Sequence, residues 1–257
     1  MQSAAFRLFF DRFFSRLINY LGNNECQATI PEAGACESTV TLTRVKSFTP
    51  TVCGPSAEQV PIRWRGEVQH VLISEEQIAR RIRKMSRDIV RDFSGREMVV
   101  VSLLNGTVLF LADLIRNLSL PLRLDFIGIS SYGNGTQSGE LVVTKELRLD
   151  VEGRDVLLVD DILDTGKTLV RVQKMLTALN PRRIKICVLL KKEARRINLI
   201  EADYVGFEIP DIFVVGYGLD FAERFRNLPF LGVLKPGVYQ NPVPTELVSK
   251  RNRVSHS

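Results

Sequence analysis

Three carboxylates and two threonine hydroxyls lie together in the segment VLLVDDILDTGKTL, which runs from residue 156 to residue 169. Asp160 and Asp161 follow four apolar residues, and Asp164 opens the short loop DTGKT. Paired carboxylates accept hydrogen bonds from vicinal hydroxyls such as those of a ribose. Threonine hydroxyls and unpaired backbone amides at the start of a helix favour a phosphate. These residue types at this spacing indicate a site for a phosphorylated sugar.

The elements around these acids predict where the site lies in the fold. The run VLLV predicts a buried strand, and TLVRVQKMLTALN predicts the helix that follows it. EMVVVSLL, LRLDFIGI and IKICVLL predict further strands, and GTVLFLADLIRNL predicts another helix. Strands and helices that alternate in this way predict an α/β fold with a mostly parallel central sheet flanked by helices. Because such sheets bind ligands at the carboxyl ends of their strands, the acids are expected at the ligand-binding edge.

Other segments complete the expected domain. In ISEEQIARRIRKMSRDI, Ser74 and Gln77 have the spacing of a capping box at the start of a helix. SSYGNGTQSG is rich in glycine and serine and predicts a loop suited to act as a lid. ELVVTKELRL predicts a hairpin.

Similar short motifs occur in unrelated families. GKT suggests a Walker A loop, but Asp161 stands where that pattern requires glycine. DTG occurs in aspartic proteases, where the frame is all-β, whereas here a helix follows. LLVDD resembles the acidic pair of response-regulator receivers, but that pair opens its domain and here strand–helix units precede it. A purely structural explanation, in which the acids form a solvated strand end, also stays open.

Composition limits the classes of partner. The chain has 257 residues, of which 45% are hydrophobic and 25% charged, as in ordinary soluble globular proteins. Its 35 basic and 29 acidic residues give a net charge of +6, which suits anionic ligands without the dense clusters of a nucleic-acid surface. We therefore expect no nucleic-acid partner. The four cysteines form no CxxC pair, which indicates free thiols in a reducing, cytoplasmic compartment.

The chain divides into four predicted parts. Residues 1–21 place phenylalanine, leucine and arginine at the spacing of an amphipathic helix, and a membrane-surface role, a targeting role and no role all stay open. Residues 22–66 lack a sustained apolar period and predict a linker or a poorly ordered segment. Residues 67–240 form the expected domain, and residues 241–257 an exposed tail.

The opening segment resembles the ribose-phosphate signature of the type I phosphoribosyltransferases, in the form found in hypoxanthine-guanine phosphoribosyltransferases. The resemblance continues through SLLNGTVLFLADLIR, ISSYGNGTQSGEL, LLKKEARR and ADYVGFEIPDIFVVGYGLDFAERFRNLP, in the family's order and spacing. It implies a central sheet with a small hood and a mobile lid. It also implies a purine-salvage enzyme that uses Mg²⁺ to transfer the phosphoribosyl group of 5-phosphoribosyl 1-diphosphate to hypoxanthine or guanine. The products would be diphosphate and IMP or GMP.

The resemblance also assigns roles to residues. It makes Asp164 the general base and gives the ribose hydroxyls to Asp160 and Asp161, the first of which is shorter than the family's usual glutamate. The 5-phosphate would be bound by Thr165, Gly166, Lys167 and Thr168. Diphosphate would be bound by Leu104, Asn105, Gly106 and Arg226. The lid would contain Ser131 and Tyr132. The purine would be bound by Lys192, Phe213, Val214 and Asp220. Mg²⁺ would be held by Asp160, Asp161 and Asp220.

Three details accompany these roles. The peptide bond between Leu104 and Asn105 is expected to be cis, as it often is in the family, and Asn105 replaces a lysine found in many members. Lys192 can only donate, so it favours a 6-oxopurine over adenine, whose amino group would oppose it as a second donor. For Phe213, packing into the core is the alternative to stacking on the base.

Two matters stay open at this point. A regulatory protein of the same fold could bind 5-phosphoribosyl 1-diphosphate without turnover. The resemblance implies a homodimer or homotetramer with small-molecule substrates, but the sequence does not decide among hypoxanthine, guanine and xanthine.

Overall fold

The computed structural model describes residues 49–52, 54–56, 59–132, 140–192 and 200–240. The predicted helix over residues 1–21, the tail over residues 241–257 and the centre of the expected lid lie outside these ranges. None of the helices in the described ranges combines the length and the apolar character that crossing a bilayer requires.

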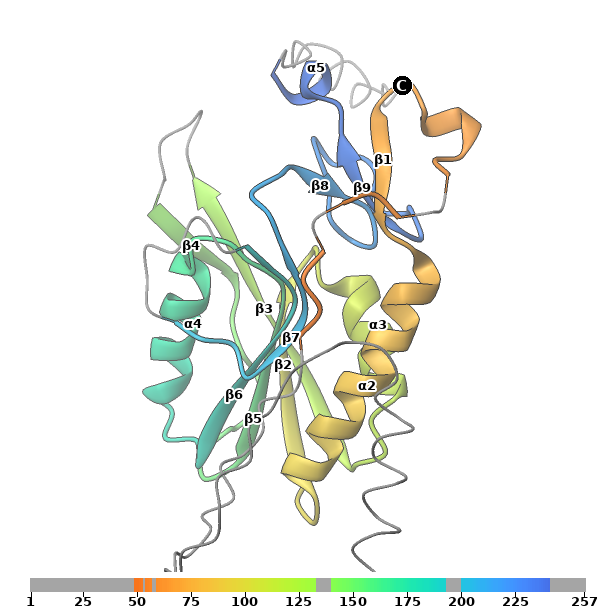
Figure 1. The fold of residues 1–257 in the computed structure, drawn as a ribbon. Coiled ribbons are helices and arrows are strands. Elements are labelled where there is room, and N and C mark those ends of the chain that lie inside the picture. The colour runs from red at the N-terminus through yellow and green to blue at the C-terminus, as the bar shows by residue number, and fades with distance from the viewer. Residues whose placement is uncertain (1–48, 53, 57–58, 133–139, 193–199, 241–257) are drawn as a thin grey trace, which may run out of the picture. The chain divides into compact units, whose positions relative to one another are not determined.

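Within the described residues, six strands form the central sheet in the order β4-β3-β2-β5-β6-β7 (Figure 1). Their bounds are β2 Met98–Leu104, β3 Leu122–Tyr132, β4 Glu140–Lys145, β5 Asp155–Leu163, β6 Arg183–Lys192 and β7 Tyr204–Ile209. All neighbouring pairs are parallel except β3 and β4. The predicted α/β fold with a mostly parallel sheet is confirmed.

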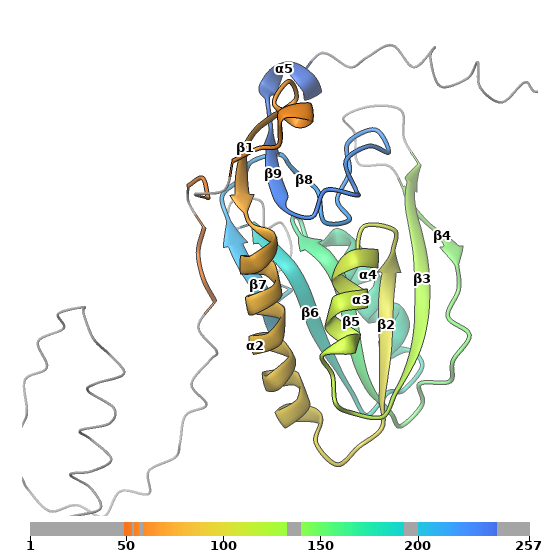
Figure 2. The same cartoon turned by 90° about the vertical axis from the view of Figure 1, so that its right-hand side faces the viewer.

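Helices cover both faces of this sheet. Figure 2 shows α2 (Glu75–Phe93) and α3 (Val108–Arg116) in front of the strands and α4 (Lys167–Thr177) behind them. The predicted capping box begins α2, because the Ser74 hydroxyl accepts from the Gln77 amide at 3.2 Å and the Gln77 side chain accepts from the Ser74 amide at 2.8 Å. This cap fixes the start of α2 directly after a strand.

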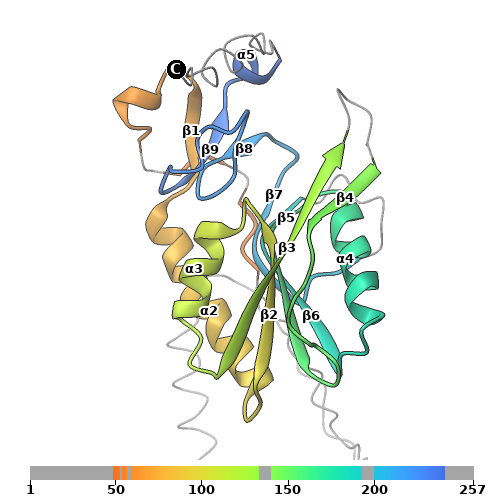
Figure 3. The ribbon, with the colours of Figure 1, turned by 180° about the vertical axis from the view of Figure 1, so that it is seen from behind.

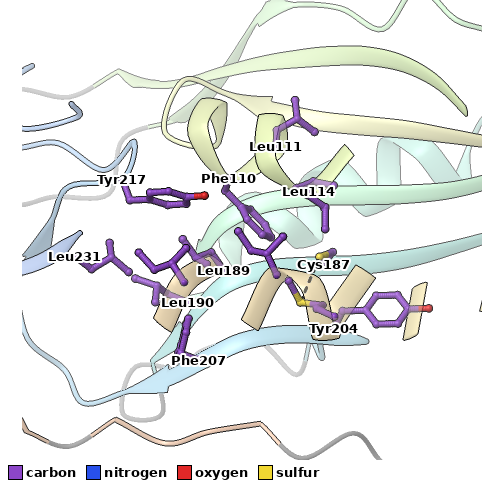
Figure 4. Packing of buried hydrophobic residues seen from close by; sticks show 14 of the residues in the cluster. Phe110, Leu111, Leu114, Cys187, Leu189, Leu190, Tyr204, Phe207, Tyr217 and Leu231 are labelled. Atoms are coloured by element: carbon purple, nitrogen blue, oxygen red, sulfur yellow. Dashed lines mark hydrogen bonds between the residues drawn. The ribbon is translucent and has the colours of Figure 1, made fainter. Parts of the chain in front are cut away.

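The apolar run of β5 is buried because its side chains alternate between two cores. Leu157 and Val159 belong to the cluster under α2 and α3, whereas Val156 and Leu158 belong to the cluster under α4. Figure 4 shows part of the first cluster, where Phe110 and Leu114 of α3 lie near Leu189 and Cys187 of β6. The Cys187 thiol is free, as predicted, and fully buried.

A second, smaller sheet lies beyond the carboxyl ends of the central strands, and we call it the hood (Figure 1). It contains β1 (Val68–Ile73), β9 (Leu231–Leu234) and β8 (Val214–Val215), all paired antiparallel. The short helix η1 (Ile62–Trp64) precedes β1 in the sequence, and the short helix α5 (Pro236–Tyr239) follows β9. The hood thus joins residues that are about 160 positions apart in the sequence.

Two segments differ in structure from what their sequences suggested. The linker was expected to reach residue 66, but Thr51 forms a parallel bridge with Glu208, and the Val52 amide donates to the Glu208 carbonyl at 2.8 Å. Val60 is buried in the core of the hood. The predicted hairpin also differs, since only β4 is a strand and its partner is β3 (Figure 3). The segment at Thr51 pairs with a remote strand, and so its own sequence carries little pattern, whereas β4 pairs with the strand that precedes it in the chain.

Candidate active site

The carboxyl end of β5 and the loop to α4 line a cavity of about 230 Å³. Asp160 and Asp161 are the sixth and seventh residues of β5, and the next carboxylate, Asp164, begins the loop. Leu104, at the end of the neighbouring strand β2, closes the cavity from the side. The structure therefore brings together the three acids that the sequence singled out and places them at the predicted edge of the sheet.

The two adjacent aspartates share a confined, desolvated position. Asp160 is only 8% exposed, and burial, followed by the charge of Asp161, raises its pKa well above the usual range. Burial also raises the pKa of Asp161, whose carboxylate accepts from the Ile162 amide at 2.7 Å. The folded protein therefore binds a proton at this pair more readily than the unfolded chain does. Ionisation of the pair at neutral pH therefore lowers the free energy of unfolding. Hydroxyl donors or a cation bound by the carboxylates would offset this loss of stability.

The loop after Asp164 forms an anion-binding helix start. Gly166 is the N-cap of α4 and has φ +77°, a left-handed conformation that glycine adopts at little cost. Gly166 has no side chain to cap this end, and the Lys167 amide makes a long hydrogen bond of 3.5 Å to the Thr165 hydroxyl. Backbone amides of the first turn of a helix lack intrahelical partners. Thr165 and Thr168 are partly buried in the cavity wall, while Lys167 is exposed. This arrangement suits a phosphate group.

Charged side chains also lie at the ends of the next two strands, β6 and β7. The Lys192 ammonium, at the end of β6, lies 4.0 Å from the Asp164 carboxylate and 3.3 Å from that of Asp211. Lys192 is 7% exposed. Sequence reasoning missed Asp211, which follows β7 in the segment EIPDIF. Its only sequence signal was its place just after a strand adjacent to the one that carries Lys192.

Phe213 lies on the surface, contrary to the alternative of core packing. Its side chain is 38% exposed. The ring packs edge-on against Phe221 at 5.5 Å and lies nearly parallel to Tyr239 at 5.1 Å, between centroids. The next residue, Val214, is buried in the hood strand β8. An exposed ring held by two aromatic neighbours can present a flat face to a planar ligand.

The expected diphosphate loop contacts the acidic pair. The peptide bond between Leu104 and Asn105 is cis, as expected. Gly106 lies so close to Asp161 that a Cβ at Gly106 would fall 1.7 Å from a carboxylate oxygen. The carbonyl of Gly106 in turn touches Gly218, where a Cβ would fall 2.0 Å from it. Glycine is therefore required at both positions for the chain segments to approach.

The other expected residues are distributed around this centre. Arg226 donates to the Gly218 carbonyl at 2.9 Å and forms an ion pair with Asp220 at 2.9 Å. Ser131 and Tyr132 end β3, and the loop that follows them is outside the described ranges.

The expected metal ligands are not clustered in the structure. In the described part of the chain, no three side chains of His, Cys, Asp or Glu lie close enough together to hold an ion, and Asp220 instead pairs with Arg226. The assignment of Mg²⁺ to Asp160, Asp161 and Asp220 stays a prediction. Mg²⁺ commonly binds through one or two carboxylates, several waters and substrate phosphates. The adjacent carboxylates of Asp160 and Asp161, beside an anion-binding loop, fit that kind of donor set.

Known proteins resemble this chain over the same region. Residues 72–222 match the family model described as phosphoribosyl transferase domain. A hypoxanthine-guanine phosphoribosyltransferase of Bacillus subtilis is 44% identical over 176 residues, which are 68% of this chain and 98% of that protein. The bifunctional protein TilS/HprT of Listeria innocua is 47% identical over 174 residues, or 67% of this chain, but the chain spans only 27% of that relative. A solved hypoxanthine phosphoribosyltransferase from Staphylococcus aureus is similar with a TM-score of 0.67 and 41% identity, covering 71% of this chain and all of that one.

Proposed function

This chain belongs to the phosphoribosyltransferase family, and we propose that it transfers the phosphoribosyl group of 5-phosphoribosyl 1-diphosphate to hypoxanthine or guanine. The reaction would form IMP or GMP and release diphosphate. The observation that carries this proposal is the cavity that Asp160, Asp161 and Asp164 line together with the amide-rich start of α4. Its donors and acceptors match a ribose that carries a phosphate.

The sugar would be bound by β5 and its loop. The Asp160 and Asp161 carboxylates accept hydrogen bonds from the ribose hydroxyls, and the loop from Thr165 to Thr168 donates amides and hydroxyls to the 5-phosphate. These donors and acceptors fix the sugar's orientation, so that its anomeric carbon faces the base. Asp160 and Asp161 would hold Mg²⁺ together with the substrate, and the ion would supply positive charge to neutralise the diphosphate.

The leaving group would lie against the loop of Leu104, Asn105 and Gly106. Departure of diphosphate gives the sugar an oxocarbenium-like character, and donors that stabilise the departing charge lower the barrier. Backbone amides of this loop and the guanidinium of Arg226 supply such donors. Arg226 is already oriented by Gly218 and Asp220. Ser131 and Tyr132 would belong to the lid that excludes water from the sugar cation.

The purine would enter between Lys192 and Phe213. Lys192 donates to the 6-oxo oxygen, Phe213 stacks on the ring, and Val214 and Asp220 lie along the other edge of the base. Asp164 shares a proton with N7, which makes N9 a better nucleophile. Adenine is disfavoured because its 6-amino group would face the ammonium of Lys192, donor against donor.

The family also suggests a cellular location and an oligomeric state. We propose that the protein works in the cytoplasm as a homodimer or homotetramer, with small-molecule substrates. The free Cys187 thiol is compatible with a reducing compartment.

A diphosphate-release assay tests the proposal. Purified protein with Mg²⁺ and 5-phosphoribosyl 1-diphosphate would be tested with hypoxanthine, guanine, xanthine, adenine and no base. We expect release with one or more 6-oxopurines and little with adenine. Binding of the sugar diphosphate with no release for any base would contradict the proposal and favour a regulatory protein of the same fold.

A further inference from the structure

Charged residues lie at or just after the ends of three adjacent parallel strands, at the base-binding side of the site. Asp164 follows β5, Lys192 ends β6 and Asp211 follows β7 by two positions. The register places Leu163 opposite Lys191, and Lys192 opposite Ile209. The parallel pairing therefore aligns the three charges in one row, with the lysine between two carboxylates.

The row is asymmetric. The Lys192 ammonium is 3.3 Å from an Asp211 oxygen but 4.0 Å from the nearer Asp164 oxygen. Its hydrogen bond goes to Asp211. The other oxygen of Asp164 is buried and makes no hydrogen bond. Lys192 is thus hydrogen-bonded to the carboxylate farther from β5, while Asp164 is not hydrogen-bonded to the lysine.

This asymmetry matters for the chemistry assigned to the two inner residues. A lysine confined next to a single carboxylate forms a close ion pair with it, since charge-assisted hydrogen bonds are the strong ones. A close pair between Lys192 and Asp164 would consume both the donor for the 6-oxo group and the acceptor for N7. A second carboxylate on the far side of the lysine prevents that loss.

We propose that Asp211 is a positioning residue for purine recognition: it holds the Lys192 ammonium away from Asp164 and toward the 6-oxo group of the base. The inference rests on the proposed function, because it assumes that Lys192 and Asp164 act on a 6-oxopurine. Asp211 itself does not touch the base. It lies two residues before Phe213, so the segment that carries the stacking ring also carries the anchor of the lysine.

The variant Asp211→Asn removes the anchoring charge with little change in size. Lys192 is then expected to pair with Asp164, which weakens both base binding and proton sharing. We expect kcat/KM for hypoxanthine to fall about 10- to 100-fold, through a higher KM for the base and a lower kcat. The KM for 5-phosphoribosyl 1-diphosphate should stay as in the wild type. Asp211→Glu, which keeps the charge, should restore most of the activity.

The same pair of strands offers a matched control. Glu208 of β7 pairs with Lys191 of β6 at 2.7 Å, next to the Lys192 pair. Glu208→Gln therefore also removes a carboxylate from a lysine at this edge, but outside the base site. It should leave both KM values and kcat unchanged.

A double-variant cycle separates positioning from a general structural role. In a Lys192→Gln background, Asp211→Asn should cause little further loss, because there is no ammonium to hold. Steady-state kinetics with hypoxanthine, together with thermal unfolding of each variant, measure this. If Asp211→Asn is insoluble, Asp211→Ser takes its place in the cycle.

The outcomes are distinct. A kinetic effect of Asp211→Asn no larger than that of Glu208→Gln, or one that persists in full without Lys192, would overturn the inference while leaving the proposed function intact. A wild-type protein that turns over no 6-oxopurine would overturn the proposed function and this inference with it. Loss of hypoxanthine turnover that depends on Lys192 and returns with Asp211→Glu would support the positioning role.

Discussion

Replacing Gly106 by alanine is expected to disable the site without unfolding the protein. The added Cβ would fall 1.7 Å from a carboxylate oxygen of Asp161 and 2.9 Å from its carboxyl carbon. Contacts under 3.0 Å are essentially never seen for a Cβ, so the carboxylate must retreat by more than 1 Å or the loop must shift. The loop has little freedom, because the Gly106 carbonyl is pressed against Gly218.

The distance by which the Asp161 carboxylate must move determines how far kcat/KM falls. Asp161 is fixed by the hydrogen bond from the Ile162 amide at 2.7 Å, which a movement of this size would break. A displacement of about 1 Å in a catalytic site can reduce the rate roughly 100-fold, so we expect about that fall in kcat/KM for 5-phosphoribosyl 1-diphosphate. The overpacking itself should cost about 1–3 kcal/mol of stability, or roughly 2–12 °C in Tm.

Steady-state kinetics and thermal unfolding would be measured in parallel on Gly106→Ala and on Gly66→Ala. Gly66 has open space around it, with no atom within 4 Å of an added Cβ, so its variant should match the wild type in both assays. A folded Gly106→Ala protein with wild-type kcat/KM would refute the argument that contact between Gly106 and Asp161 orients the ribose-binding acid.

Three further predictions follow from the site and from the boundaries of the domain. Asp160→Asn should raise the urea midpoint at neutral pH while lowering turnover. The gain should shrink as the pH falls and should vanish below the ordinary aspartate pKa near 4, where the wild-type carboxyl is protonated in both states; an unchanged or lower midpoint at neutral pH would contradict the direction given for its pKa. Asp164→Asn should lower kcat about 10²- to 10⁴-fold with little effect on binding of 5-phosphoribosyl 1-diphosphate, and unchanged turnover would remove Asp164 from its role as base. Deleting residues 1–48 should leave a folded, active enzyme. Deleting residues 1–66 should lower Tm, because it removes Val60 from the core of the hood. Equal Tm values for the two truncated proteins would show that residues 49–66 do not stabilise the domain.

The features that the sequence predicted well are local. The four apolar residues of β5, the acids after them and the helix from Lys167 all follow one another along the chain, so strand, loop and helix start could be predicted together. The capping box at Ser74 is likewise contained in four residues. A parallel sheet then brings the strand ends together without further information, which is why three of the site's acids were found.

The features that the sequence did not reveal depend on remote partners. The pairing of β1 with β9 and the bridge between Thr51 and Glu208 each join segments about 160 residues apart. Asp211 was missed because a single acid after a proline has no periodic pattern, and its role is visible only from its distance to Lys192. The ion pair between Asp220 and Arg226 also joins residues whose contact no local pattern announces.

The connection from β7 to the hood has a mechanical consequence. Only residues 210–213 separate β7 from β8, and this short span carries both Asp211 and Phe213. The ribose-binding acids Asp160 and Asp161 instead lie on β5, in the interior of the central sheet. Rotation of the hood would therefore displace the aromatic ring and the lysine's anchor directly, and would reach Asp161 only through the contact of Gly218 with Gly106. The base-binding residues are thus coupled to the hood more directly than the ribose-binding acids are.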